Sequence, residues 1–178
     1  MNDIQVPKAL LNAAPSPSPS PVDAADYRKA LGCFATGVTV VSARWQHTDW
    51  GMTCNSFASV SLDPALVLWS IRREASSLDA FLHSGGFTVN VLSADQSHLA
   101  RQFATGPLAE RWQGVPVERL ASERLRLSES VAWFDCRLHQ SVAAGDHWIL
   151  IGEVQHYGWQ DDTPLTYCRS QMGRLSPL

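Results

Sequence analysis

Residues 36–71 read TGVTVVSARWQHTDWGMTCNSFASVSLDPALVLWSI, and they contain the pattern that decides the fold class. The run from Gly37 to Trp45 is rich in β-branched residues and is long enough for a strand. A polar turn leads to a second strand-like segment, Trp50–Ser61. Asp63-Pro64 then separates it from a third, almost wholly apolar strand at Ala65–Ile71. Consecutive short strands joined by turns favour an antiparallel sheet.

The rest of the chain extends this pattern in both directions. Further strands are predicted at Phe87–Leu92, Ser130–Val142, His147–Trp159 and Pro164–Arg169, and residues 105–129 are predicted to be an irregular connection. Helices are expected only in short pieces. One is capped by Asp23 and has Tyr27, Ala30, Leu31 and Phe34 at helical spacing, a second covers Ser76–His83, and a third follows the capping box that begins at Ser93. The chain is therefore predicted to be mainly β, an antiparallel barrel with short helical inserts.

Length and composition limit the function classes. The 178 residues fit one domain, with residues 1–22 as a flexible Pro/Ser-rich tail and residues 23–178 as the folded part. A net charge of −3 gives no basic surface for nucleic acid, and no apolar run is long enough to cross a membrane. The N-terminus lacks the pattern of a secretory signal, so the cytoplasm is the default expectation.

The common catalytic and metal-binding motifs are missing. The chain has no G-x-G-x-x-G, no G-x-S-x-G and no pair of histidines at metal-ligand spacing, so no metal site is expected. The four cysteines form no C-x-x-C pair, and we interpret them as buried or half-buried thiols that pack like small apolar residues: Cys33, Cys54, Cys136 and Cys168.

Residues 52–64 carry an unusual density of small polar side chains for a strand. Hydroxyl and carboxamide groups at Thr53, Asn55, Ser56, Ser59 and Ser61 let a planar ligand approach the backbone and offer hydrogen bonds to its rim and phosphate oxygens. An exposed polar strand face has the same composition, so composition alone leaves both interpretations open.

Five segments in order carry a family resemblance: Phe34–Ser42, Gly51–Pro64, Phe87–Ser93, Phe134–Cys136 and Gly145–His147. Together they resemble the short-chain flavin reductases, the reductase components of two-component flavin-dependent monooxygenases. The resemblance implies an antiparallel Greek-key split β-barrel (the FMN-binding split barrel), a homodimer, and non-covalent FMN or FAD reduced by NADH or NADPH. It also implies a partner monooxygenase that receives the reduced flavin by diffusion.

The resemblance also assigns site residues. By position, the flavin contacts would be Thr53, Cys54, Asn55, Ser56, Ser59, Val60, Ser61, Leu62, Ser70, Ile71, Ala75 and Ser76, with Ala75 and Ser76 at the phosphate. His147 matches the histidine on the nicotinamide side of the site and is the candidate catalytic residue. Arg72 and Arg73 would add charge near the phosphate or form a solvated basic pair, and the sequence leaves both open.

The chain departs from the family pattern near its end. Gln171 and Met172 stand where relatives have a basic residue and a tyrosine, which puts the mode of nicotinamide binding in question. A non-catalytic flavin- or haem-binding split-barrel protein is therefore the alternative, and a pyridoxamine-phosphate-oxidase-like enzyme is a third interpretation. The sequence has no cluster of arginines that would bind the 2′-phosphate of NADPH, so it favours NADH.

Overall fold

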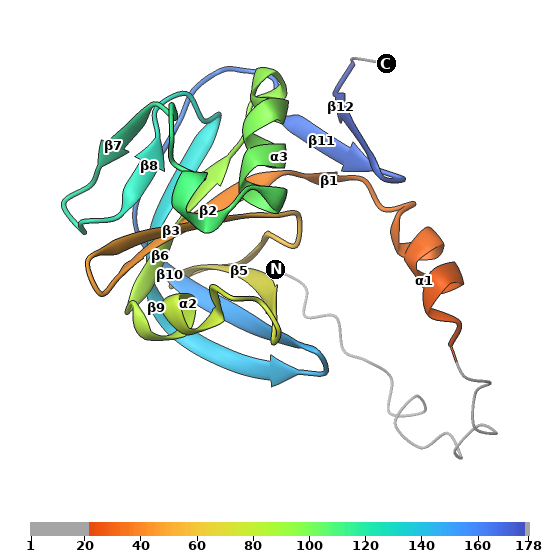
Figure 1. Cartoon of the computed structure of the whole chain (residues 1–178), viewed down its shortest axis with the longest axis horizontal. Coiled ribbons are helices and arrows are strands. Elements are labelled where there is room, and N and C mark those ends of the chain that lie inside the picture. The colour runs from red at the N-terminus through yellow and green to blue at the C-terminus, as the bar shows by residue number, and fades with distance from the viewer. Residues whose placement is uncertain (1–21, 177–178) are drawn as a thin grey trace.

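The computed structural model describes residues 22–176, and its main sheet is antiparallel throughout. Seven strands pair in the order β3-β2-β6-β9-β10-β5-β4. They are β2 (Thr39–Trp45), β3 (Thr48–Cys54), β4 (Ala58–Leu62), β5 (Ala65–Arg72), β6 (Gly86–Val91), β9 (Ala132–Ala144) and β10 (His147–Trp159). This sheet curves on itself (Figure 1), so the predicted antiparallel barrel is confirmed.

Two smaller sheets flank the main one. The first has the order β1-β11-β12, formed by β1 (Thr36–Gly37), β11 (Leu165–Cys168) and β12 (Gln171–Arg174). The second is the hairpin of β7 (Val117–Arg119) and β8 (Leu125–Leu127). Strand β1 lies directly before β2 in the chain, and Thr39 at the start of β2 pairs with Cys54 at the end of β3. The first small sheet therefore adjoins the end of β3, where the polar segment of residues 52–64 begins.

Buried apolar side chains of the strands form two clusters. Trp69 is the centre of the larger one and packs edge-on against Phe81 and Phe87, with ring centres 4.8 and 5.7 Å apart. Edge-to-face pairs of this kind add to the stabilisation from burial. The second cluster lies beneath α3 (Ser97–Thr105) and includes Phe103 and Leu127, both fully buried.

The helices are short, as the sequence predicts. Asp23 caps α1 (Ala24–Leu31), and its carboxylate accepts hydrogen bonds from the amides of Ala25 and Asp26 at 2.9 and 2.8 Å. The segment Leu78–His83 forms α2, and the capping box of Ser93 and Gln96 precedes α3 through a 3-10 turn.

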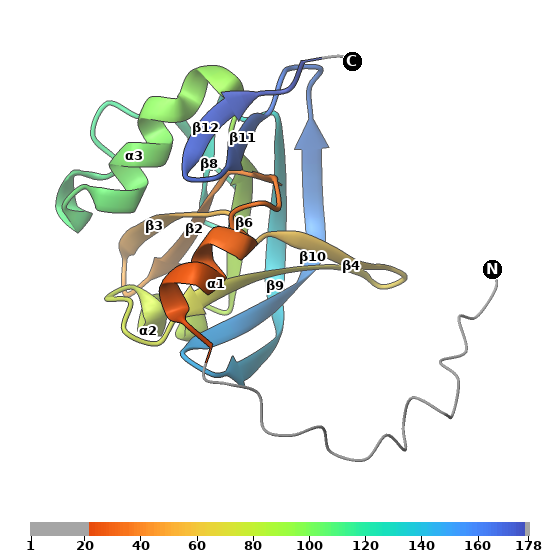
Figure 2. The same cartoon turned by 90° about the vertical axis from the view of Figure 1, so that its right-hand side faces the viewer.

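Helix α1 differs from the other two because none of its residues is buried. Figures 1 and 2 show it standing outside the main sheet, and Figure 2 shows the β4–β5 hairpin extending beyond the rest of the sheet. Tyr27, Leu31 and Phe34 remain 54%, 55% and 77% exposed, and Leu62 on β4 is 93% exposed. These apolar side chains have no cover within the described part of the chain.

Polar contacts hold the start of β3. The carboxylate of Asp49 pairs with Arg44 at 3.0 Å and with Arg119 of β7 at 2.8 Å. Partial burial alone would raise the pKa of Asp49, but the two arginines hold it below its ordinary value.

Three sequence predictions need correction. Residues 50–61 are not one strand but two, β3 and β4, separated at residues 55–57. The connection at 105–129 contains the β7–β8 hairpin rather than only irregular chain. Cys54 and Cys136 are buried and Cys168 is partly buried, but Cys33 is exposed. Nearly all of the predicted tail, residues 1–21, lies outside the described residues.

No helix within residues 22–176 has the length and apolar character needed to span a bilayer.

Candidate functional site

A cavity of about 340 Å³ lies where the end of β3 meets the end of β5 and the start of β10. Its lining combines residues that are far apart in the sequence: Met52, Thr53, Cys54, Asn55, Ser56, Ser70, Arg72, Ala75 and His147. Seven of these were predicted as site residues from the sequence, and Met52 was missed. The structure therefore brings most of the predicted set to one place.

Ser56 fixes the chain at the point where β3 ends. Its hydroxyl accepts a hydrogen bond from the backbone amide of Ser70 at 2.9 Å and donates one to the carbonyl of the same residue at 3.2 Å. Both backbone groups of Ser70 are thereby satisfied on the side that faces away from β10. Because the Ser56 proton is already used, this side chain positions the cavity wall rather than donating to a ligand.

Two further hydroxyl groups near the cavity also donate hydrogen bonds within the protein. The hydroxyl of Thr53 donates to the carbonyl of Ala100 in α3 at 2.7 Å. Thr39 donates to the carbonyl of Cys54 at 3.0 Å, and its oxygen lies 3.1 Å from the Cys54 sulfur. Burial raises the pKa of the Cys54 thiol, which keeps it protonated and chemically quiet at neutral pH.

Arg72 and Arg73 have different surroundings, and only the Arg72 side chain lines the cavity. Arg72 lines the cavity beside Ala75. Arg73 is not part of the lining, and its guanidinium carbon lies 5.9 Å from the centre of the Trp148 ring. The backbone amide of Arg73 donates to the carbonyl of Asp146 at 2.9 Å, which anchors this turn to the β9–β10 hairpin.

His147 begins β10 and pairs in register with Arg72 of β5. Its Nδ1 lies 2.7 Å from the Asp146 carboxylate, and its side chain is 36% exposed. The hydrogen bond with His147 lowers the pKa of Asp146. This contact fixes the ring and leaves Nε2 for a ligand in the cavity.

A second cavity of about 250 Å³ shares one wall with the first. Thr53, Cys54 and Asn55 line both, and the second is completed by Val38, Ala100, Ala104, Tyr167 and Met172. Met172, which departs from the family pattern, therefore lies beside the predicted site. Gln171 is exposed and lines neither cavity.

Some predicted residues lie apart from these cavities. Ser59, Val60, Ser61 and Leu62 line a separate depression of about 480 Å³ on the projecting β4 strand. The side chain of Ile71 is 1% exposed and belongs to the core, and Ile71 does not line the cavity. Ser76 is exposed and is not part of the lining.

The lining suits a flat, phosphorylated ligand such as a flavin mononucleotide. Met52 and Ala75 provide apolar surface, Ser70 contributes a hydroxyl, Asn55 contributes a carboxamide, and Arg72 provides a positive charge. The cavity contains no covalent anchor, and most of its hydroxyl protons are used internally. Within one chain, the hydroxyls of Thr53 and Ser56 are therefore not free to donate to such a ligand.

Comparison with known proteins points in the same direction. A family model described as the flavin reductase like domain matches residues 31–176. The FMN reductase (NADH) SmoA of Agrobacterium fabrum is 42% identical over 157 residues, covering 84% of this chain and 85% of that protein. The reductase component of the Thermus thermophilus 4-hydroxyphenylacetate 3-monooxygenase is 35% identical over 150 residues, covering 84% and 95%.

Solved structures agree in fold. The Streptomyces globisporus NADH:FAD oxidoreductase SgcE6, in complex with NAD and FAD fragments, superposes with a TM-score of 0.84 at 31% identity and covers 91% of this chain and 98% of that one. The flavin reductase PheA2 superposes with a TM-score of 0.81 at 36% identity, covering 88% and 100%.

Proposed function

The chain belongs to the flavin reductase-like family, and on this premise we propose that it transfers hydride from NADH to FMN or FAD and releases the reduced flavin to a separate monooxygenase. The observation that carries the proposal is the cavity at the ends of β3 and β5. It gathers Thr53, Cys54, Asn55, Ser56, Ser70, Ala75 and His147 from four separate stretches of the chain. That grouping does not follow from a polar strand face alone.

Bound flavin would supply the redox chemistry, because its ring accepts the hydride. The protein would bind and orient both reactants. Arg72 and the turn at Ala75, which line the cavity, would hold the flavin phosphate, and Ser56 would keep the cavity wall in position through its hydrogen bonds to Ser70. The proximity of two reactants in fixed orientation accounts for much of the acceleration available to such a site.

His147 would act on the nicotinamide donor. Its ring is oriented by Asp146, and the free Nε2 can hydrogen-bond the carboxamide of the nicotinamide. The cavity lined by Tyr167 and Met172 adjoins this region and provides space for the donor. Met172 offers a flexible thioether where relatives place a phenol, so the donor would be held by packing rather than by a hydroxyl.

The proposal includes a homodimer. The exposed apolar side chains of α1 and of the β4 strand need cover, and a second copy of the chain is the occupant we propose. Support comes from Tyr27, Leu31, Phe34 and Leu62, each of which is more than half exposed. Leu62 is one of the β4 residues predicted to contact flavin, so a dimer that covers β4 would complete the site.

We also propose a partner monooxygenase, because the cavity is suited to reversible flavin binding. A site with few ligand contacts holds flavin weakly and reversibly, as transfer by diffusion requires. The 4-hydroxyphenylacetate 3-monooxygenase reductase component of Thermus thermophilus is a reductase of this type by its description. The substrate of the partner enzyme is left open.

The test is oxidation of NADH by the purified protein, followed by its near-ultraviolet absorbance, with FMN, FAD or no flavin added. We expect flavin-dependent turnover, and weaker turnover with NADPH. No turnover with any pair, despite flavin binding, would instead favour a flavin carrier or sensor.

His147→Ala should raise the KM for NADH while leaving the flavin Kd nearly unchanged. Kinetics identical to those of the unmodified protein with both reactants would contradict the role given to His147.

A further inference from the structure

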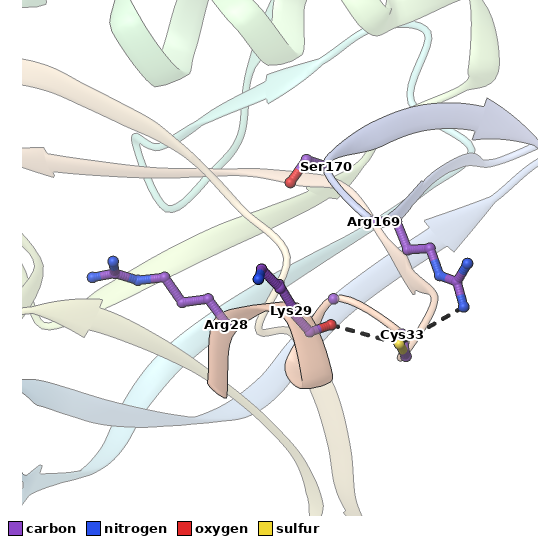
Figure 3. Close-up of a pocket in the computed structure, with 6 residues that line it drawn as sticks. Arg28, Lys29, Cys33, Arg169 and Ser170 are labelled. Carbon is purple, nitrogen blue, oxygen red and sulfur yellow. Dashed lines mark hydrogen bonds between the residues drawn. The ribbon is translucent and has the colours of Figure 1, made fainter. Parts of the chain in front are cut away.

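Cys33, which the sequence pattern placed in the interior, lies on the wall of a third cavity, outside the site described above. This cavity of about 400 Å³ is lined by Arg28, Lys29, Gly32, Cys33, Arg169 and Ser170 (Figure 3). Cys33 is the exposed thiol of the four, so an oxidant in solution can reach its sulfur. In the figure the Arg169 side chain reaches toward that sulfur.

A second thiol, that of Cys168, contacts the peptide group that precedes Cys33. The Cys168 thiol donates to the carbonyl oxygen of Gly32 at 3.5 Å, and the amide of Arg169 donates to the same oxygen at 2.8 Å. That carbonyl belongs to the peptide bond that joins Gly32 to Cys33. Standard peptide geometry puts its oxygen about 3 Å from the Cα of Cys33, so the Cys168 sulfur lies within about 6.5 Å of that Cα.

We infer that Cys33 and Cys168 are a reactive pair that closes to an intramolecular disulfide under peroxide. Disulfides join Cα atoms about 4.4 to 6.8 Å apart. The hydrogen bond from the Arg169 amide to the Gly32 carbonyl keeps the Cα atoms of Cys33 and Cys168 within about 8 Å, so closure requires a small shift of the chain. Cys33 follows the end of α1, where the chain leaves the helix and can adjust.

The surroundings of Cys33 favour reaction at this sulfur. It makes two weak contacts, donating to the carbonyl of Lys29 at 3.5 Å and accepting from an Arg169 Nη2 at 3.9 Å. Neither contact is strong enough to lock the rotamer. The guanidinium of Arg169 also places a positive charge beside the sulfur, and such surroundings are typical of reactive cysteines.

The turn that carries Arg169 is the two-residue connection between β11 and β12. Arg169 and Ser170 have φ of 48° and 64°, as the type I′ turn of a tight hairpin requires. This turn presents Arg169 to the Cys33 sulfur, which lies 3.9 Å from its Nη2.

The cavity and the apolar face proposed for the dimer are lined by different residues of this segment. Tyr27 and Leu31 lie one turn apart and share the exposed apolar face of α1. Arg28, Lys29, Gly32 and Cys33 instead line the cavity beside the β11–β12 turn, although Phe34 of the apolar face directly follows Cys33.

The oxidation balances with one peroxide. The Cys33 thiolate attacks the O–O bond of hydrogen peroxide, which forms a sulfenic acid and releases hydroxide. The Cys168 sulfur then attacks the Cys33 sulfur, so that the S–S bond forms, the S–O bond breaks and a second hydroxide leaves. The two thiol protons convert both hydroxides to water. Two sulfurs are oxidised and one peroxide is reduced.

The test uses the full-length protein, reduced, freed of reductant and treated with one equivalent of hydrogen peroxide per chain. Thiols are counted after denaturation, and we expect the number to fall from the four in the sequence to two. Peptide mass mapping should show Cys33 linked to Cys168 within one chain, while Cys54 and Cys136 stay reduced and act as internal controls. Dithiothreitol should restore all four thiols.

Two variants make the result decisive. Cys33→Ser should keep its three remaining thiols under the same dose. Cys168→Ser should lose one thiol and accumulate a sulfenic acid that dimedone captures. Retention of all four thiols in the unmodified protein, a Cys33 link between two chains, or equal thiol loss in Cys33→Ser would overturn the inference. Because peroxide is added directly, the outcome does not depend on flavin reduction.

Discussion

Arg72 and Arg73 are adjacent residues of the same charge, and the structure assigns them different tasks. Arg72 lines the cavity, whereas Arg73 lies against Trp148. We predict that Arg72→Ala weakens FMN binding and that Arg73→Ala changes it less than twofold. The second variant removes the same charge one residue along the chain, so it is a matched control for net charge.

The magnitude follows from the exposure of Arg72 and from its lack of a strong partner. None of the ion pairs among residues 22–176 includes Arg72. The positive charge of Arg72 contributes slightly to the lowered pKa of Asp146, so this carboxylate is its nearby but weak partner. A hydrogen bond to a charged group contributes about 1.5–3 kcal/mol, and solvent screening at an exposed site reduces this to about 1–2 kcal/mol. The FMN Kd should therefore rise roughly 5- to 30-fold.

The assay is a titration of each variant with FMN and with riboflavin, followed by quenching of flavin fluorescence. Riboflavin has no phosphate, so its Kd should be the same in Arg72→Ala and in the unmodified protein. The FMN difference should also shrink at about 1 M salt, where the screening length is about 3 Å. Equal losses for FMN and riboflavin, or equal losses in the two arginine variants, would refute the assignment of Arg72 to the phosphate.

Three further outcomes are expected. Ser56→Ala should lower the free energy of unfolding by about 1–2 kcal/mol, since two hydrogen bonds to Ser70 are lost, while the exposed Ser141→Ala control should change it by less than about 0.5 kcal/mol in urea melts. The ion pairs that lower the pKa of Asp49 stabilise the fold above about pH 4, and this contribution is lost as pH falls through the lowered pKa; Asp49→Asn should therefore flatten the acid limb of the stability curve. Phe34→Asp should shift the protein from dimer to monomer in sedimentation experiments without changing its circular dichroism.

Strands that are buried on one or both faces could be predicted from the sequence. The β-branched runs of β2 and β6 and the apolar run of β5 fall where the pattern indicates, because burial of these faces selects such residues. The short hairpin of β7 and β8 was missed, since a strand of three residues shows too little periodicity, and all three residues of β7 are exposed.

The site depended on contacts that the sequence does not display. The break between β3 and β4 is fixed by the hydrogen bonds of Ser56 to Ser70, a pairing across 14 positions. The choice between Arg72 and Arg73 follows from the register of β5 against β10, which places Arg72 opposite His147. Cys33 was expected to be buried because it lies among apolar residues, but the apolar face of α1 has no cover within the described chain.

The cavity at the ends of β3 and β5 has most of its hydroxyl protons engaged by the protein itself. We expect such a wall to bind flavin as an exchangeable substrate rather than as a permanently bound cofactor. We expect purification to yield a colourless protein, with the yellow flavin washed away. In the cell the rate of turnover would then depend on the concentration of free flavin as well as on the concentration of NADH.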